Sequence, residues 1–186
     1  MRILGISGSL RRDSYNTRLL AAAAEGLPDD AELVRWDGLA AVPPFDEDAE
    51  GEPAPEAVEA LRAAIADADA VLFATPEYNG SVPGQLKNAL DWVSRPHATN
   101  PLRNTPVAVV GASTGGFGAA WAQADLRRIL GRIGARVLDT ELAVTHAHTR
   151  CDERGNLVDD EVRDALANVV SELVSQAHTR RELLAA

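Results

Sequence analysis

A short polar stretch near the start of the sequence, GSLRRDSYNT at 8–17, has the residue types of an anion-binding loop. It follows the apolar run RILGIS and precedes a helical pattern, so it occupies a turn from strand to helix. The N–H groups and the macrodipole at the start of a helix both favour a negative charge. The donors of this stretch are Ser9, Arg11, Ser14, Asn16 and Thr17. They suit a terminal phosphomonoester, and helix capping by Ser14 or Asn16 alone is the other interpretation.

This loop matches neither of the common nucleotide-phosphate motifs. A Walker A loop ends in Lys followed by Ser or Thr, and a dinucleotide fingerprint needs three spaced glycines, whereas the stretch has one Gly and no Lys. A nucleoside triphosphate would also bring Mg²⁺ and require acidic ligands. A nicotinamide-dinucleotide dehydrogenase, with Asp37 as a ribose ligand after the second strand, lacks its glycine fingerprint and is therefore disfavoured.

Two more polar, glycine-rich stretches each follow an apolar run: TPEYNGSVPG at 75–84 and GASTGGFG at 111–118. The first offers an aromatic face and amide groups, and the second offers hydroxyls and glycines that allow close backbone approach. Their candidate binding residues are Pro76, Glu77, Tyr78, Asn79, Gly80, Ser113, Thr114, Gly115 and Gly116. A flat polar ring fits between such loops, and a simple tight turn at Asn79 and Gly80 is the alternative.

Apolar runs alternate with amphipathic stretches along the chain. Strand-like runs lie at 2–7, 31–36, 69–75, 105–113 and 135–145, and helical patterns lie at 15–26, 55–67, 82–94, 117–132 and 159–180. Three of the runs are nearly continuous Ile, Leu, Val and Ala, as in parallel strands covered on both faces. The alternation predicts an α/β fold, a flavodoxin-like doubly wound five-stranded parallel sheet of order 2-1-3-4-5. All three polar stretches would then lie at the carboxyl edge of the sheet, where ligands bind.

Composition limits the classes of function. The 186 residues suit a single domain over 1–186, and the formal charge of −10 disfavours nucleic acid and anionic membrane surfaces. The longest apolar runs are too short to cross a bilayer, and the start of the chain does not resemble a secretory signal. A single cysteine, Cys151, forms no internal disulfide, so we expect a cytoplasmic protein.

Two other segments have open interpretations. The Pro- and acid-rich stretch VPPFDEDAEGEPAPE at 42–56 is a solvated connection, and its alternative role is a stiff lid or a flap that contacts a partner. The stretch HAHTRC places His146, His148 and Cys151 close together, so two imidazoles on one strand face would resemble a metal site. A fourth ligand is not evident, and surface histidines are the favoured interpretation; a reactive Cys151 thiol has no support in the sequence.

The stretches GSLRRDSYN, PEYNGSVPGQLKNALDW and GASTGGFGA together resemble the NADPH-dependent FMN reductase family, from about Ile3 to Gly134. The resemblance implies that the FMN phosphate is held by Ser9, Arg11, Ser14, Asn16 and Thr17. It implies that the isoalloxazine is lined by Pro76, Glu77, Tyr78, Asn79 and Gly80, with Ser113, Thr114, Gly115 and Gly116 on its other edge.

The same resemblance implies an oxidoreductase with FMN as cofactor and NADPH or NADH as co-substrate. Its small-molecule electron acceptor would be a flavin, a quinone, an azo compound or a metal oxyanion, and no catalytic side chain is required. A flavodoxin-like FMN electron carrier without NAD(P)H activity is the alternative. Family members form homodimers or homotetramers, and Lys87, Asp91 and Trp92 resemble that interface; for Lys87 and Asp91 the alternative is an ion pair along one helix.

Overall fold

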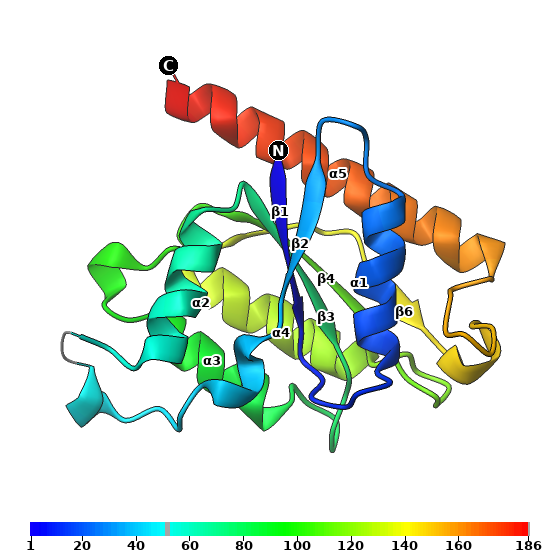
Figure 1. Cartoon of the computed structure of the whole chain (residues 1–186), viewed down its shortest axis with the longest axis horizontal. Helices are drawn as coiled ribbons and strands as arrows, with labels where there is room; N and C mark the ends of the chain where they lie inside the picture. Colours follow the sequence, from blue (N-terminus) through cyan, green and yellow to red (C-terminus); the bar gives the residue numbers. More distant parts are fainter. Residues whose placement is uncertain (51–52, 186) are drawn as a thin grey trace.

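The chain forms a parallel β-sheet with helices packed on both faces, in a computed structural model that describes residues 1–50 and 53–185 (Figure 1). The strands are β1 (Arg2–Ser7), β2 (Glu32–Trp36), β3 (Ala70–Thr75), β4 (Pro106–Ala112), β5 (Arg136–Val137) and β6 (Leu142–Val144). The helices are α1 (Tyr15–Glu25), α2 (Glu56–Ala66), α3 (Gly84–Val93), α4 (Ala120–Ile133) and α5 (Asp160–Ala185). The strand order β2-β1-β3-β4-β5 confirms the predicted flavodoxin-like topology.

The two faces of the sheet bury two separate apolar clusters. Successive residues of a strand point to opposite faces, so Leu72 and Phe73 of β3 belong to different clusters. Leu20 of α1 and Leu173 of α5 pack on the Leu72 face, whereas Leu126 of α4 packs on the Phe73 face together with α2 and α3. Figure 1 shows this division, with α1 and α5 on one side of the strands and α2, α3 and α4 on the other. The carboxyl edge of the central strands therefore stays free of covering helices.

The prediction of one continuous last strand at 135–145 is wrong. The chain instead forms two short strands, β5 and β6, which pair with the beginning and the end of β4. The chain between them leaves the sheet because Asp139 and Glu141 extend into solvent, 109% and 68% exposed. Arg127 of α4 binds the segment between β5 and β6, since its Nη1 donates to the carbonyl oxygen of Thr140 at 3.1 Å.

Helix boundaries follow local backbone geometry. The predicted helix at 117–132 starts late, at Ala120, because Gly118 and Ala119 both adopt left-handed conformations with φ of 57° and 63°. The last helix runs to Ala185, beyond the predicted end at 180. Among the helices of the described residues, none has the combination of length and apolar character needed to cross a membrane.

Candidate functional site

Three loops at the carboxyl edge of the sheet enclose a cavity of about 250 Å³. They are the β1–α1, β3–α3 and β4–α4 loops, which meet because β1, β3 and β4 are parallel neighbours. The predicted residues that line the cavity are Ser9, Arg11, Ser14, Asn16, Pro76, Glu77, Tyr78, Ser113 and Thr114. Tyr15 and Ala112 complete the lining, and the sequence analysis did not single them out.

The other predicted residues, Thr17, Asn79, Gly80, Gly115 and Gly116, are not among the lining residues. The Thr17 hydroxyl donates to Ser7 Oγ at 3.1 Å. Asn79 and Gly80, with φ of 52° and 75°, form an exposed turn between the mutually hydrogen-bonded Tyr78 and Ser81. The Gly115 carbonyl oxygen accepts from the N–H of His146 at 3.1 Å. In this structure these residues shape the loops.

Asn16 joins the β1–α1 loop to the end of β4. Its Nδ2 donates to the carbonyl oxygen of Ala112 at 3.1 Å, and its Oδ1 accepts from the Ala112 N–H at 2.9 Å. The side chain is 3% exposed. Ser14 is the N-cap of α1, and its hydroxyl accepts from the Asn16 N–H at 3.2 Å. The Asn16 amide thus fixes the start of α1 beside the third loop, a link between residues that are 96 positions apart.

Arg11 supplies the positive charge of the cavity. Its Nη2 donates to the carbonyl oxygen of Asp13 at 2.6 Å, and its backbone N–H donates to Ser9 Oγ at 3.3 Å. The guanidinium carbon lies 5.3 Å from the centre of the Tyr15 ring, and that of Arg18 lies 5.2 Å from the same centre. Cations therefore approach the start of α1, where the helix macrodipole already favours an anion.

Glu77 ties the β3–α3 loop to α4. Its Oε2 accepts from the N–H of Ala122 at 3.1 Å, in the first turn of α4. The N-cap position of this helix, Ala119, has no side-chain oxygen, so Glu77 supplies the missing acceptor from another loop. The Glu77 carboxylate, which was predicted to line the isoalloxazine ring, thus also accepts a hydrogen bond from a free N–H group at the start of α4.

A second link joins the same loop to α4. The Ser81 hydroxyl donates to Asp125 Oδ2 at 2.8 Å. This hydrogen bond lowers the pKa of Asp125, and Arg128 lowers it further. Glu77 and Ser81, which lie on either side of the Asn79–Gly80 turn, therefore both bind the β3–α3 loop to α4.

The β4–α4 loop is fastened to the segment after β6. Ser113 receives a hydrogen bond at its carbonyl oxygen from Ala147 and donates its own N–H to Val144, each at 3.0 Å. Gly118 lies so close to β6 that a Cβ there would come within 2.5 Å of the Ala143 backbone. The close approach requires glycine, and it sets the path of the loop into α4.

Comparison with known proteins decides the family. The family model described as NADPH-dependent FMN reductase matches residues 1–149. The chain belongs to the NADPH-dependent FMN reductase family. It is 42% identical over 167 residues to an NAD(P)H-dependent FMN reductase of Pseudomonas aeruginosa, with 89% of each chain covered. It is 36% identical over 182 residues to a 2-hydroxy-1,4-benzoquinone reductase of a Burkholderia species, with 97% of this chain and 98% of the relative covered.

A solved structure of similar shape is that of FerB from Paracoccus denitrificans, described as a flavoenzyme NAD(P)H:(acceptor) oxidoreductase. The two chains superpose with a TM-score of 0.86 at 32% identity, over 96% of this chain and 97% of FerB. With 96% of this chain covered, the match extends beyond Gly134, where the resemblance in sequence was weak.

The donor set of the cavity fits the cofactor of this reductase family. The β1–α1 part of the lining combines the Arg11 guanidinium with the hydroxyls of Ser9 and Ser14. Glu77 is the one acid among the lining residues, and its carboxylate is bound to the start of α4. A phosphate at α1 would therefore meet donors and a cation, while Pro76, Tyr78 and Ser113 leave a less charged region for a planar ring.

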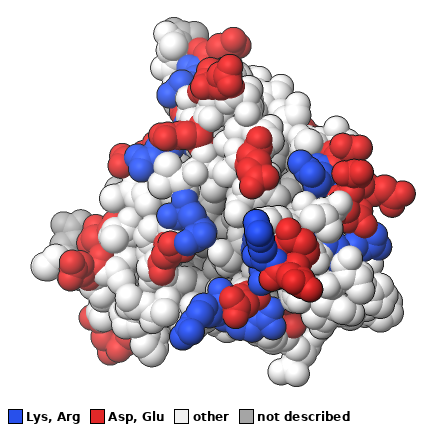
Figure 2. All heavy atoms as spheres, turned by 45° about the vertical axis from the view of Figure 1, so that its right-hand side comes forward, with Lys and Arg blue, Asp and Glu red and all other residues white. Residues whose placement is uncertain are grey.

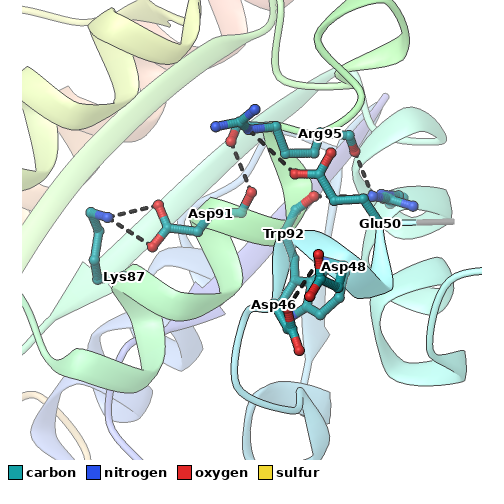
Figure 3. Close-up of polar contacts among 9 residues, drawn as sticks. Asp46, Asp48, Glu50, Lys87, Asp91, Trp92 and Arg95 are labelled. Atoms are coloured by element: carbon teal, nitrogen blue, oxygen red, sulfur yellow. Dashed lines mark hydrogen bonds and ion pairs between the residues drawn. The ribbon is translucent and has the colours of Figure 1, made fainter.

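Trp92, expected at an interface between family subunits, is instead part of the core. It is 1% exposed, and its Nε1 donates to the carbonyl oxygen of Pro43 at 2.9 Å. The Phe45 ring packs edge-on against it at 5.1 Å. Figure 3 shows Lys87 and Asp91 pointing toward each other along α3, while Trp92 turns away toward the stretch around Asp46 and Asp48. Lys87 Nζ lies 2.7 Å from Asp91 Oδ1, so the ion pair along one helix is the geometry observed.

The Pro- and acid-rich connection at 42–56 packs on α3. Asn88 donates to the Pro43 carbonyl oxygen at 2.8 Å and accepts from the Phe45 N–H at 2.7 Å. Farther along, Glu50 pairs with Arg95 at 3.8 Å, also visible in Figure 3. Positions 51–52 of this predicted connection lie outside the described residues. Contacts made by residues within 42–50 therefore hold this part of the connection to its own chain.

The histidine and cysteine cluster is not arranged as a metal site. His146 has a left-handed backbone and precedes a short 3-10 turn at Ala147–Thr149, so the two imidazoles do not share a strand face. Within residues 1–50 and 53–185, no group of three or more His, Cys, Asp or Glu side chains is placed to hold a metal ion. Cys151 is half-buried, and this burial raises the pKa of its thiol, which disfavours the reactive thiolate.

Proposed function

We propose that residues 1–186 act as one FMN-binding domain with NAD(P)H-dependent oxidoreductase activity. The observation that carries the proposal is the cavity where three strand ends converge, with Arg11 and the start of α1 at one end and Tyr78, Ser113 and Thr114 at the other. Bound FMN supplies the redox chemistry, a hydride accepted from NAD(P)H and electrons passed to a second substrate. The relatives named FMN reductase and quinone reductase support this reading over an electron carrier.

The side chains of the cavity would position the cofactor and stabilise its charges. Arg11, Ser9 and Ser14 hold the phosphate with the N–H groups at the start of α1, and Thr17 supports them through Ser7. The isoalloxazine ring would lie among Pro76, Tyr78, Ser113 and Thr114. Negative charge on a bound ring would be stabilised by backbone N–H groups of the β4–α4 loop, which we assign to the stretch around Gly115 and Gly116, next to the lining residues Ser113 and Thr114.

We propose a small planar electron acceptor, of the quinone type, as the second substrate. The Tyr78 side chain is 54% exposed beside the cavity and offers an aromatic face. Nucleic acid is disfavoured as a partner by the formal charge of −10. On the face drawn in Figure 2, blue Lys and Arg side chains are interspersed with red Asp and Glu side chains rather than joined in a basic stripe.

The direct test is anaerobic reduction of the FMN-loaded protein. We expect NADPH or NADH alone to bleach the flavin absorption within seconds in a stopped-flow instrument, and a quinone added afterwards to restore it. An electron carrier would bleach only after a separate reductase is added. Absence of bleaching by both nucleotides would reject the proposed activity.

We also propose a homodimer or homotetramer in the cytoplasm. Phe117 and Trp121 are 65% and 52% exposed at the start of α4, with ring centroids 4.6 Å apart, and such an aromatic pair is typical of interfaces. Light scattering should give two or four times the monomer mass, and Trp121→Glu should shift the protein toward the monomer. A wild-type monomer would contradict the assembly. The cytoplasmic location is supported by the lone Cys151, and recovery of the protein outside the cytosolic fraction would contradict it.

A further inference from the structure

A second cavity, of about 220 Å³, lies beside the proposed phosphate site, at the carboxyl ends of β1 and β2. Arg12 of the β1–α1 loop lines it together with Arg35, Trp36 and Asp37 at the end of β2. It shares Ser9 and Arg11 with the first cavity, so the two are neighbours across the β1–α1 loop. Figure 1 shows these strand ends at the same edge of the sheet.

The second cavity carries a local excess of positive charge on an acidic protein. Three guanidinium groups, those of Arg11, Arg12 and Arg35, line it, against the single carboxylate of Asp37. Arg35 and Asp37 form a two-point pair, with Nε to Oδ1 at 2.5 Å and Nη2 to Oδ2 at 2.9 Å. The side chain of Arg12 donates no hydrogen bond to any of the described residues. Arg12 is therefore available to an anionic ligand.

Trp36 is among the residues that line the second cavity, and it also packs against the apolar cluster on the Phe73 face of the sheet. Trp36 is half-buried and lies against Gly38, where a Cβ would come within 2.6 Å of Trp36 Cζ2. Because Gly38 has no side chain, the Trp36 ring packs directly against its backbone, which restricts the position of the ring. Fixed aromatic faces and arginines are the groups on which nucleic-acid bases stack.

We propose that the second cavity binds a phosphorylated adenosine, with Arg12 and Arg35 facing the phosphate and Trp36 facing the base. The inference rests on the proposed function, because two dinucleotides could supply this group. NADPH would place its adenosine 2′-phosphate here while FMN is bound, and FAD would place its adenylate half here when it binds instead of FMN. Arg11 is assigned to the FMN phosphate and Arg35 is paired with Asp37, so Arg12 carries the positive charge that is left for a ligand, and the doubly charged 2′-phosphate of NADPH matches it best. Asp37, which the sequence placed near a ribose in a disfavoured dehydrogenase, then belongs to the co-substrate site of a flavoenzyme.

Equilibrium binding tests this site without relying on turnover. Calorimetry on the FMN-loaded protein would compare NADP⁺ with NAD⁺ for the wild type, Arg12→Gln and Arg35→Gln. Arg132→Gln is the matched control, because Arg132 is an exposed arginine near the end of α4, at the opposite edge of the sheet. We expect the wild type to prefer NADP⁺ by about tenfold, and each cavity variant to lose about five- to tenfold in NADP⁺ affinity with NAD⁺ binding unchanged. The control should match the wild type.

A second arm identifies the source of the adenosine. FAD and FMN are allowed to compete for the wild-type and variant proteins. If Arg12→Gln and Arg35→Gln weaken FAD relative to FMN and leave NADP⁺ unchanged, the site is confirmed and its ligand is the adenylate of FAD. If neither the NADP⁺/NAD⁺ nor the FAD/FMN ratio changes, the inference is overturned. A wild type that is bleached by NAD(P)H while these ratios stay constant would overturn this inference and leave the proposed function intact.

Discussion

Replacing Asn16 by alanine is expected to lower the free energy of unfolding by about 2 to 6 kcal/mol and to weaken FMN binding. The substitution removes both hydrogen bonds to Ala112, whose N–H and carbonyl oxygen are buried at the end of β4. Each buried group left without a partner costs about 1 to 3 kcal/mol. Because the same contact holds α1 beside the β4–α4 loop, the donors around the phosphate also lose their fixed arrangement.

Urea unfolding at a fixed flavin concentration would measure this loss, since a bound ligand adds to the apparent stability. The matched control is Asn168→Ala, an exposed asparagine on α5, for which we expect a change within about 0.5 kcal/mol. If Asn16→Ala were as stable as this control, the link between the two loops would not be formed in the protein.

The sequence predicted the loops of the site well because their positions depend on local patterns. Continuous apolar runs located β1, β3 and β4 to within one residue at each end, and the polar stretches that follow them necessarily share one edge of a parallel sheet. Local patterns could not predict which group the Asn16 side chain contacts. Its donor chemistry was evident, but the group it contacts lies 96 residues away and depends on the packing of α1 against β4.

Two errors have a similar origin. An aromatic residue on an amphipathic helix can face its own core or a second subunit, and Trp92 faces its own core because Pro43 brings a carbonyl oxygen to the indole. The last strand was predicted as continuous because the apolar residues before Asp139 and after Glu141 resemble one run, although Asp139, Thr140 and Glu141 interrupt it. That pattern does not reveal that Arg127 of α4 binds the chain between β5 and β6, where it lies outside the sheet.

Replacing Arg11 by glutamine is expected to weaken FMN binding by about 10- to 100-fold, because a hydrogen bond to a charged group contributes about 1.5 to 3 kcal/mol. Arg11 is exposed and its guanidinium donates to one carbonyl oxygen, so the fold should be nearly unaffected. Arg18→Gln is the control: its guanidinium lies at a similar distance from the Tyr15 ring, but Arg18 does not line the first cavity. It should change FMN affinity by less than about threefold.

The most direct test of phosphate recognition at the start of α1 compares FMN with riboflavin, the same ring without its phosphate. Fluorescence titration of the wild-type protein should show a preference for FMN of at least about 100-fold, and Arg11→Gln should lose about tenfold or more of that preference with riboflavin affinity unchanged. Equal affinities for the two flavins in the wild type, or an undiminished preference in Arg11→Gln, would contradict the central claim that Arg11 and the β1–α1 loop hold the phosphate.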